Sequence, residues 1–228
     1  MMIEPLEWDT NFFSKKIGQI QFDTFNNENL EDECYDLLYV KSNVNQIFQI
    51  KNYEESFSET KVIYSKGIIG QKSIDDRNIF SGFEIAIDKS KIYDLAYESG
   101  KFSRFNLDKK FTKSEFTKLY RKWVNNSFER LNADNILVYI KDEHISGFVT
   151  YKITGNTAVI GLIGVNQLCQ GKGIGSKLIK SVENILNKEK VIELIIPTQL
   201  KNTQACNFYN KMGYKIIDKL IVKHFWRI

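Results

Sequence analysis

The pattern of hydrophobic and polar residues predicts an α/β protein, and it is most regular in the C-terminal half of the chain. Residues 157–165 form a short β-branched run, which is typical of a buried strand. Residues 174–186 repeat apolar side chains at helical spacing, with lysines and polar residues between them. A second apolar strand is predicted at 191–196. The glycine-rich residues 170–176 therefore lead from a strand into a helix.

The same pattern predicts the elements that precede this unit. Residues 136–140 and 145–153 form a hairpin, and residues 89–99 form a helix. Thr112 and Glu115 make a capping box ahead of an amphipathic helix. We expect this helix to be the first of the C-terminal domain.

The first hundred residues follow a strand, helix, strand, strand order, which is typical of a smaller α/β layer. Strands are predicted at 17–25, 46–50, 61–64 and 80–87, and a helix at 30–40. No low-complexity tract or proline-rich linker marks a border. We expect an N-terminal α/β domain at residues 1–105 and a second domain at residues 106–228.

Composition and charge narrow the class of protein. The 228 residues are 43% hydrophobic and 13% aromatic, enough for one large core or two modest ones. A net charge of +4 is too small for a nucleic-acid interface but favours anionic small molecules such as coenzyme A. No apolar run approaches the ~20 residues of a membrane span, and the N-terminus lacks signal-peptide features. Cys34, Cys169 and Cys206 show no metal-ligand spacing. We expect a cytoplasmic protein with no metal, nucleic-acid partner or membrane partner.

Residues 170–176, which read Gln-Gly-Lys-Gly-Ile-Gly-Ser, form the strand-to-helix turn. The first amides of the helix have no intrahelical partners there, and together with the helix dipole they attract anions. A dinucleotide fingerprint does not fit, because Ser176 takes the place of its last glycine. A Walker A loop does not fit either, because no Gly-Lys-Ser/Thr follows Gly175. The spacing of Gln170, Gly173 and Gly175 instead resembles the pyrophosphate loop of the GNAT superfamily of acyl-CoA-dependent N-acyltransferases.

A second segment strengthens this resemblance. Residues 202–214 fit the family pattern Asn-x-x-Ala-x-x-Phe-Tyr-x-x-x-Gly-Phe/Tyr place for place. The resemblance implies a C-terminal GNAT fold, a mixed and splayed central sheet with flanking helices, that uses acetyl-CoA or a larger acyl-CoA as co-substrate. It also implies a set of coenzyme A contacts on strand, loop and helix: Ile163, Val165, Gln170, Gly171, Lys172, Gly173, Gly175, Ser176, Asn202 and Lys211. From the residues alone, Asn202 also fits a helix N-cap, and the two lysines also fit solvated surface positions.

Two N-terminal segments narrow the resemblance. Residues 6–13 fit Leu-x-Trp-Asp-x-x-Phe-Phe, and residues 99–105 read Ser-Gly-Lys-Phe-Ser-Arg-Phe. Together with the C-terminal half they resemble the dTDP-fucosamine acetyltransferase family over nearly the whole chain. This resemblance implies acylation of the sugar amine of dTDP-4-amino-4,6-dideoxy-D-galactose, a nucleotide sugar used in surface polysaccharides such as the O-antigen of lipopolysaccharide.

Acyl transfer to an amine requires a neutral amine, a polarised thioester carbonyl and a proton for the leaving thiolate. Tyr209 matches the family's proton donor, and a phenol with an ordinary pKa of about 10 is protonated at neutral pH. A core aromatic is the alternative for Tyr209. No carboxylate lies on the strand 157–165, where many GNAT enzymes carry a glutamate, so a water relay or an amine that is already neutral is left as the route. His224 is the one tempting imidazole, although a structural histidine also fits.

The candidates for binding the acceptor are Ser103, Arg104, Phe105, Tyr120 and His224. An arginine can grip a diphosphate through paired hydrogen bonds, and aromatic rings can stack on a base or a sugar. The aromatic candidates are also expected in a helix core.

Two other functions stay open from the sequence. A GNAT enzyme for a protein, peptide or antibiotic amine would need an acidic groove, whereas this chain is mildly basic. A non-catalytic acyl-CoA-binding sensor would have no need of Tyr209. The acyl group, the amino sugar, the position of its amine and the oligomeric state are also left open, and a homodimer is compatible with the sequence.

Overall fold

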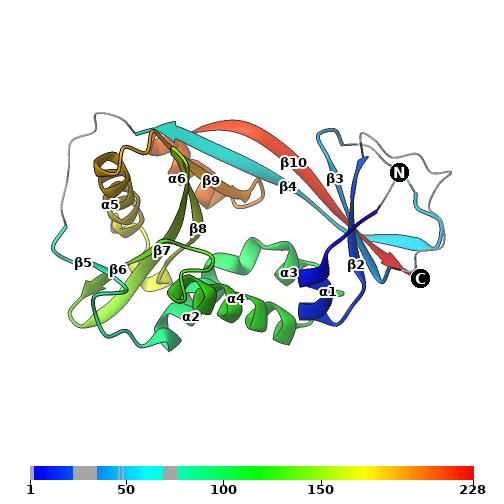
Figure 1. Cartoon of the computed structure of the whole chain (residues 1–228), viewed down its shortest axis with the longest axis horizontal. Coiled ribbons are helices and arrows are strands. Elements are labelled where there is room, and N and C mark those ends of the chain that lie inside the picture. The colour runs from blue at the N-terminus through cyan, green and yellow to red at the C-terminus, as the bar shows by residue number, and fades with distance from the viewer. Residues whose placement is uncertain (1–2, 23–34, 46, 48, 69–75) are drawn as a thin grey trace.

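The computed structural model describes residues 3–22, 35–45, 47, 49–68 and 76–228. These residues form one mixed sheet of ten strands, with helices packed on both faces (Figure 1). The order of the strands is β1-β2-β3-β10-β4-β9-β8-β7-β6-β5. The predicted α/β class with a splayed central sheet is confirmed. Among the described residues, no helix has the length and apolar character that a membrane crossing requires.

The secondary-structure elements have the following bounds. The strands are β1 (Glu4–Pro5), β2 (Ile17–Gln21), β3 (Leu37–Ser42), β4 (Tyr53–Gly67), β5 (Ile79–Ser81), β6 (Asn135–Lys141), β7 (His144–Thr154), β8 (Thr157–Val165), β9 (Glu193–Gln199) and β10 (Lys215–Arg227). The helices are α1 (Glu7–Phe13), α2 (Lys89–Ser99), α3 (Arg104–Leu107), α4 (Lys113–Phe128), α5 (Ile174–Lys188) and α6 (Thr203–Lys211), with 3₁₀ turns η3 (Gly100–Phe102) and η4 (Gln167–Cys169).

The two faces of the sheet carry different helices and different cores. On one face Leu178 and Val182 of α5 and Tyr209 of α6 share a core with Val62 and Tyr64 of β4. On the other face α2, α3 and α4 enclose a core that is rich in aromatic rings. Because successive side chains of a strand point to opposite faces, the neighbours of Val62 and Tyr64 along β4 point toward α3 and α4.

The parallel pair β8 and β9 is joined over only part of its length. Their register holds at three positions, Thr157 with Glu193, Ala158 with Leu194 and Val159 with Ile195. Beyond this point β8 continues to pair with β7 and β9 with β4. The two central strands therefore diverge toward their C-terminal ends.

The N-terminal part of the chain supplies a central strand of the sheet. β4 lies between β9 and β10, and β10 in turn pairs with β3. Figure 1 shows β4 and β10 as two long strands that run from the helical end of the molecule to the end formed by β2, β3 and α1. The division into domains at residue 105 stays a prediction, and one sheet runs through both of its parts.

Most predicted elements of the C-terminal half are confirmed. The predicted hairpin is β6 and β7, the β-branched run is β8, and the amphipathic helix after the glycines is α5. Thr112 and Glu115 form the predicted capping box at the start of α4. The predicted helix at 89–99 is α2, and the strand at 61–64 is part of the longer β4.

Four predictions in the N-terminal half need correction, and the first two concern a helix and a strand. The predicted helix at 30–40 is wrong over residues 37–40, which belong to β3; residues 30–34 lie outside the described part of the chain. This apolar run is buried as a strand between β2 and β10, where a strand needs no alternation. The predicted strand at 80–87 shrinks to β5, because the chain turns at Gly82, whose N–H donates to Ile136 O.

The other two predicted N-terminal strands are shorter than expected or absent where the structure describes them. Only residues 17–21 of the strand predicted at 17–25 are in β2, and residues 23–25 lie outside the described part. Residues 47, 49 and 50 are not in a strand, while residues 46 and 48 lie outside the described part.

Candidate active site

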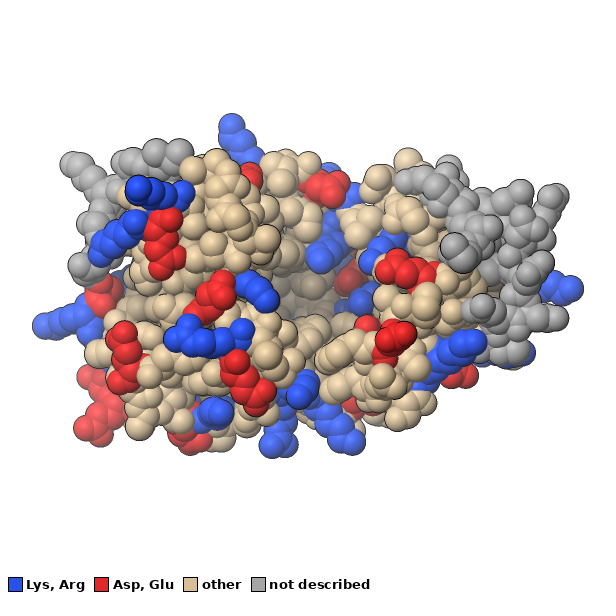
Figure 2. Space-filling view, viewed as in Figure 1, with Lys and Arg blue, Asp and Glu red and all other residues tan. Residues whose placement is uncertain are grey.

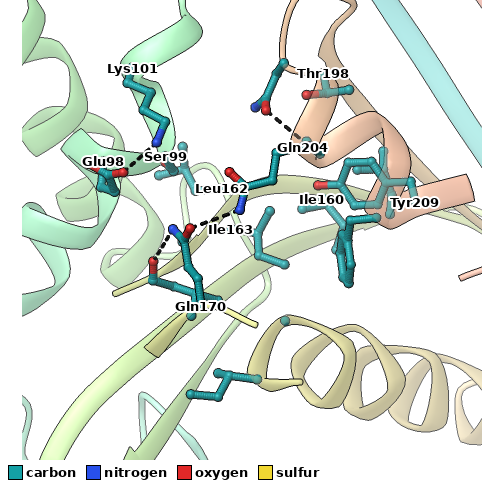
Figure 3. A pocket seen from close by; sticks show the side chains of 18 of the residues that line it. Glu98, Ser99, Lys101, Ile160, Leu162, Ile163, Gln170, Thr198, Gln204 and Tyr209 are labelled. Carbon is teal, nitrogen blue, oxygen red and sulfur yellow. Dashed lines mark hydrogen bonds and ion pairs between the residues drawn. The ribbon is translucent and has the colours of Figure 1, made fainter. Parts of the chain in front are cut away.

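A cavity of about 430 Å³ opens where β8 and β9 diverge (Figure 3). Its walls come from both strands, from the glycine loop before α5, from α6, and from the end of α2. Among the residues predicted for the site, the cavity is lined by Tyr120, Ile163, Val165, Gln170, Gly171, Gly173, Gly175, Ser176, Asn202 and Tyr209. The fold therefore brings the two sequence motifs together on one cavity.

The glycine loop owes its shape to two left-handed residues. Gly171 and Gly173 have φ values of 76° and 78°, and Gly173 is the N-cap of α5. A side chain at such a φ would strain the backbone. The first helical hydrogen bond runs from Lys177 N to Gly173 O at 3.0 Å, so the amides of residues 174–176 point out of the helix end. Amides arranged in this way, at the positive end of a helix dipole, suit the phosphates of a nucleotide.

Gly175 serves a different purpose, which is close packing. A Cβ at this position would lie 3.3 Å from Phe208 Cζ of α6. The absence of a side chain lets α6 approach the start of α5. The two motifs are thus held side by side by direct contact between their helices.

The edge of β8 presents two amides to the cavity. Leu162 N donates to Thr150 Oγ1, and Asn166 N donates to Ser146 O, both at 2.9 Å and both toward β7. Because successive N–H groups of a strand point to opposite edges, those of Ile163 and Val165 face the gap between β8 and β9. These are the two residues whose amides the resemblance assigns to coenzyme A.

Gln170 ties the loop to this strand edge. Its Nε2 donates to Val165 O at 3.2 Å, and its Oε1 accepts from Gln204 Nε2 of α6 at 3.0 Å (Figure 3). The carbonyl of Val165 points to the same strand edge as its N–H group, and this hydrogen bond is consistent with that edge facing the gap. The glutamine of the motif therefore positions the loop through its side chain and lines the cavity at the same time.

Tyr209 lies on α6 with its hydroxyl turned into the cavity (Figure 3). Only 3% of the residue is exposed, and its ring packs 5.5 Å from the ring of Tyr64 and 6.2 Å from that of Tyr214. Burial raises the pKa of Tyr209 well above its ordinary value of 10. The phenol is therefore protonated over the whole physiological range and can donate a proton.

Asn202 has the structural role that the sequence offered as an alternative. It is the N-cap of α6, and its Oδ1 accepts from Ala205 N at 3.2 Å. The residue also lines the cavity. The capping function is confirmed, and contact with a cofactor stays a prediction.

Several predicted residues lie away from the cavity lining. Lys172 and Lys211 are exposed at the surface. Phe105 is buried in the aromatic core, 5.5 Å from the ring of Phe13. Ser103 is buried as the N-cap of α3, where its hydroxyl accepts from Phe105 N at 3.1 Å. Their packing accounts for Phe105 and Ser103 without a ligand.

His224 belongs to a buried polar cluster. Its Nδ1 lies 2.6 Å from Asp108 Oδ2, which also accepts from Trp226 Nε1 at 3.0 Å and from Ser56 Oγ at 3.1 Å. His224 is fully buried, and burial lowers its pKa to about 4. The imidazole is neutral at pH 7 and ties α3 to β10. These contacts are those of a structural histidine.

The sequence alone missed a buried carboxylate near Tyr120 of the cavity lining, that of Glu59 of β4. Glu59 is 8% exposed, and its Oε2 has no hydrogen-bond partner among the described residues. Burial raises its pKa, an effect that Arg104 and Lys61 partly oppose. Glu59 also acts electrostatically on Tyr120, a cavity residue whose pKa burial raises to about 12. A buried carboxyl with a raised pKa beside a cavity is a candidate proton acceptor.

A signal for Glu59 exists in the sequence, although it is weak. Phe57, Glu59, Lys61 and Ile63 alternate with residues of the opposite face along one strand. Only the pairing of β4 with β9 brings this face to the cavity, because Lys61 lies opposite Gln199 and Gln199 lines the cavity.

Arg104 is held above the same face. Its guanidinium carbon lies 4.0 Å from the ring centroid of Tyr39 and 4.7 Å from that of Phe105. Stacking on aromatic rings fixes the side chain while leaving its donors available.

Comparison with known proteins agrees with this architecture. The model of the acetyltransferase (GNAT) family matches residues 100–214, which are 115 of the 228 residues. The spore coat polysaccharide biosynthesis protein SpsD of Bacillus subtilis (strain 168) is 24% identical over 139 residues, 61% of this chain and 48% of SpsD. The uncharacterized N-acetyltransferase MJ1530 of Methanocaldococcus jannaschii is 31% identical over 86 residues, 37% of this chain and 54% of that protein. The chain thus spans about half the length of the curated relatives it matches.

Solved structures share the fold at low sequence identity. A functionally unknown conserved protein from Staphylococcus epidermidis ATCC 12228 superposes with a TM-score of 0.57 at 18% identity, over 85% of this chain and 74% of that one. A GCN5-related N-acetyltransferase from Sphaerobacter thermophilus gives a TM-score of 0.52 at 13% identity, over 82% of this chain and 59% of that one. Because the family model covers half of the sequence and the fold agrees with it, the chain belongs to the acetyltransferase (GNAT) family.

Proposed function

We propose that this enzyme transfers an acyl group from acyl-CoA to the amine of a dTDP-linked amino-dideoxysugar, in the biosynthesis of a surface polysaccharide. The observation that carries the proposal is the position of the cavity. It is lined by the glycine loop and Tyr209, and also by Tyr120, on which the charges of Glu59 and Arg104 both act. The similarity to SpsD, a spore coat polysaccharide biosynthesis protein, supports the choice of a sugar acceptor. Such an enzyme would work in the cytoplasm, where acyl-CoA and nucleotide sugars are both present.

On the cofactor side, backbone groups do most of the binding. The diphosphate of coenzyme A lies against the loop residues 170–176, whose amides point out of the start of α5. The pantetheine arm runs along the edge of β8 and pairs with the amides of Ile163 and Val165. Asn202 contributes its side-chain amide, which has donors left after its Oδ1 caps α6. Lys172 and Lys211 add positive charge near the phosphates from the surface.

On the acceptor side, Arg104 binds the diphosphate, and Tyr120 contacts the sugar from the cavity wall. Ser103, Phe105 and His224 support this side from behind the surface, since all three are buried in contacts of their own. The arrangement directs the amine of the sugar toward the opening between β8 and β9.

The reaction is a direct transfer. The amine nitrogen attacks the thioester carbonyl, a C–N bond forms, and the C–S bond breaks. Glu59 takes the proton that the amine nitrogen loses, through a water, and Tyr209 gives its proton to the departing thiolate. The strand amides polarise the carbonyl oxygen. Glu59 thus fills the role for which the sequence offered no side chain.

The test is release of the coenzyme A thiol with a panel of acceptors. We expect release from acetyl-CoA with a dTDP-linked amino-dideoxysugar, and none with the matched sugar that carries a hydroxyl in place of the amine. Peptide amines and an aminoglycoside complete the panel. Release that is faster with these amines, or absent with every amino-sugar nucleotide, would contradict the proposed substrate. Repeating the assay with longer acyl-CoA esters identifies the acyl group.

A further inference from the structure

Three cationic side chains gather on the face of the sheet that leads away from the cavity. Lys41 of β3 lies opposite Val222 of β10, and Val222 lies opposite Glu59 of β4. Directly opposite residues of antiparallel strands point to the same face, so Lys41 and Glu59 share a face two strand spacings apart, about 10 Å. Lys61 is two residues from Glu59 on β4 and points the same way.

Arg104 adds the third cation from above the sheet. Its guanidinium carbon stacks 4.0 Å from the ring centroid of Tyr39, and Tyr39 is two residues from Lys41 on the same strand. The positive charge of Arg104 lowers the pKa of both Lys41 and Lys61, with burial as the larger cause in each case. The three charges are therefore close enough to repel one another.

This repulsion is not relieved by ion pairs. Among the described residues, none of the three cations has a carboxylate oxygen within 4.0 Å. Lys41 Nζ instead donates to the neutral side chain of Gln19. The carboxyls of Glu4 and Asp9 act on Lys41, and that of Glu59 acts on Lys61, without forming an ion pair with either lysine. Half-buried like charges without a paired carboxylate are costly, and a ligand with negative charge would offset that cost.

The cation face is continuous with the cavity. Lys61 lies opposite Gln199 of β9, which lines the cavity. Glu59 and Arg104 both act electrostatically on Tyr120, another cavity residue. Figure 2 shows this side of the molecule hollowed near its middle, with Lys and Arg side chains at the edges of the hollow.

We propose that Lys41, Lys61 and Arg104 form an anion subsite that holds the diphosphate of the acceptor. The inference rests on the proposed function, and it adds two lysines as ligands and an orientation for the bound acceptor. The diphosphate lies over β3 and β4, and the amine end reaches past Glu59 to the cavity. This subsite is separate from the loop at the start of α5, which holds the diphosphate of coenzyme A. Side-chain cations would therefore bind the diphosphate of the acceptor, and backbone amides would bind that of coenzyme A.

Calorimetry on the purified enzyme tests the subsite without turnover. dTDP, inorganic pyrophosphate and coenzyme A are titrated separately into the wild type and into the Lys41→Gln and Lys61→Gln variants. We expect each variant to weaken dTDP about tenfold, as for the loss of one charge-assisted contact, and to leave the Kd of coenzyme A unchanged. Lys41→Gln is the sharper variant, because Lys41 is farther from Glu59. Lys118→Gln on the exposed side of α4 removes the same charge away from the site and should alter none of the three affinities.

The pyrophosphate arm separates a subsite for the diphosphate from one that requires the nucleoside. Weak pyrophosphate binding that both variants reduce supports recognition of the phosphates themselves. Unchanged dTDP affinity in both variants would overturn the inference, as would a loss of coenzyme A affinity that equals the loss for dTDP.

Kinetics distinguish the failure of this inference from the failure of the proposed function. With the amino-sugar nucleotide, the lysine variants should raise KM about tenfold and leave kcat nearly unchanged. An enzyme that acylates amino sugars but binds neither dTDP nor pyrophosphate retains its proposed reaction and lacks this subsite. An enzyme that binds dTDP through the two lysines yet releases no thiol retains the subsite and lacks the proposed reaction.

Discussion

The regions proposed to bind the cofactor and the acceptor use different kinds of chemical group. On the cofactor side, the groups that face the cavity are mainly backbone amides, and they come from two short segments with the glycine loop and Tyr209. On the face proposed for the acceptor, which lies beyond the cavity lining, the polar groups are charged side chains from β3, β4 and α3, which are far apart in the sequence. Backbone groups serve any member of a family that uses the same cofactor. Side chains can be exchanged without disturbing the fold, so we expect this face to determine the choice of acceptor.

We expect the largest effect from removing the Tyr209 hydroxyl, the proposed proton donor on the cofactor side. Tyr209→Phe removes the proton donor and keeps the ring that packs against Tyr64. We expect kcat to fall by about 10²–10⁴-fold, the usual contribution of a general acid, while the Kd of coenzyme A stays the same. Steady-state kinetics and calorimetry measure the two quantities. Tyr53→Phe also removes one hydroxyl, which donates to Tyr35 O at 2.9 Å far from the cavity, and should leave kcat unaltered. Equal kcat in Tyr209→Phe and wild type would exclude the donor role.

The next effect addresses the base on the acceptor side. Glu59→Gln should lower kcat by about 10²-fold at neutral pH, because the amide cannot take up a proton. In the wild type the rate should rise with pH through the pKa of Glu59, which lies above the ordinary 4.5, and this acidic limb should vanish in the variant. A pH–rate profile measures both. Glu98 is the competing carboxylate, since it lines the cavity itself and pairs there with Lys101 at 2.7 Å (Figure 3). Loss of the acidic limb in Glu98→Gln instead would transfer the role to that residue.

A smaller effect compares two glycines with the same backbone conformation. Gly173→Ala places a Cβ at φ 78°, which costs about 1–2 kcal/mol, and should also weaken coenzyme A by disturbing the loop. Gly155→Ala is the matched control, because Gly155 has φ 60° in the turn between β7 and β8 and an added Cβ meets nothing within 4 Å at either position. Thermal unfolding should show similar losses of stability in both variants. Calorimetry should show weaker coenzyme A binding in Gly173→Ala alone. Weaker binding in both variants would mean that the loop is not the specific cause.

The smallest effect is on stability, and it has the opposite sign to the effect on activity. Because burial raises the pKa of Glu59, the folded state binds its proton more tightly than the unfolded chain does. That contribution is fully present below the unfolded pKa and is lost as the pH rises through the folded pKa. Glu59→Gln should therefore gain stability relative to the wild type, by about 1 kcal/mol or less, at pH 8 but not at pH 4. Chemical denaturation at the two pH values checks the difference, and a constant difference would contradict the raised pKa.

Local patterns succeeded where neighbouring residues determine the structure. The capping box of Thr112 and Glu115 and the hairpin of β6 and β7 depend on contacts within a few residues. The local patterns failed where a strand is buried on both faces, because such a strand does not alternate apolar and polar residues. Residues 37–40 fitted a helical prediction together with Leu30 and yet form β3, because both faces of this strand are buried, Leu37 and Tyr39 in one core and Leu38 and Val40 in another.

The candidate site likewise contains residues that local sequence predicts and residues that only the tertiary structure reveals. The glycine spacing and the Asn202 to Tyr214 segment indicated the family from single stretches of chain, because the turn, the helix start and the position of Tyr209 on α6 are local properties. His224 was open to two interpretations, and its full burial and its hydrogen bond with Asp108, which also accepts from Trp226, favour the structural one. Glu59 was missed because the surroundings of a carboxylate on a strand cannot be predicted until the neighbouring strands are known.

The sequence by itself determined the α/β class and the strand-to-helix turn at the glycine loop, and it singled out Tyr209 as the candidate proton donor, since each depends on residues a few positions apart. Only the tertiary structure decided which side chains meet across the acceptor face. Glu59, Lys61 and Lys41 reach it through the insertion of β4 between β9 and β10 and through the register of those strands. Shifting the register by one residue would turn all of them to the opposite face, and no local pattern encodes that choice.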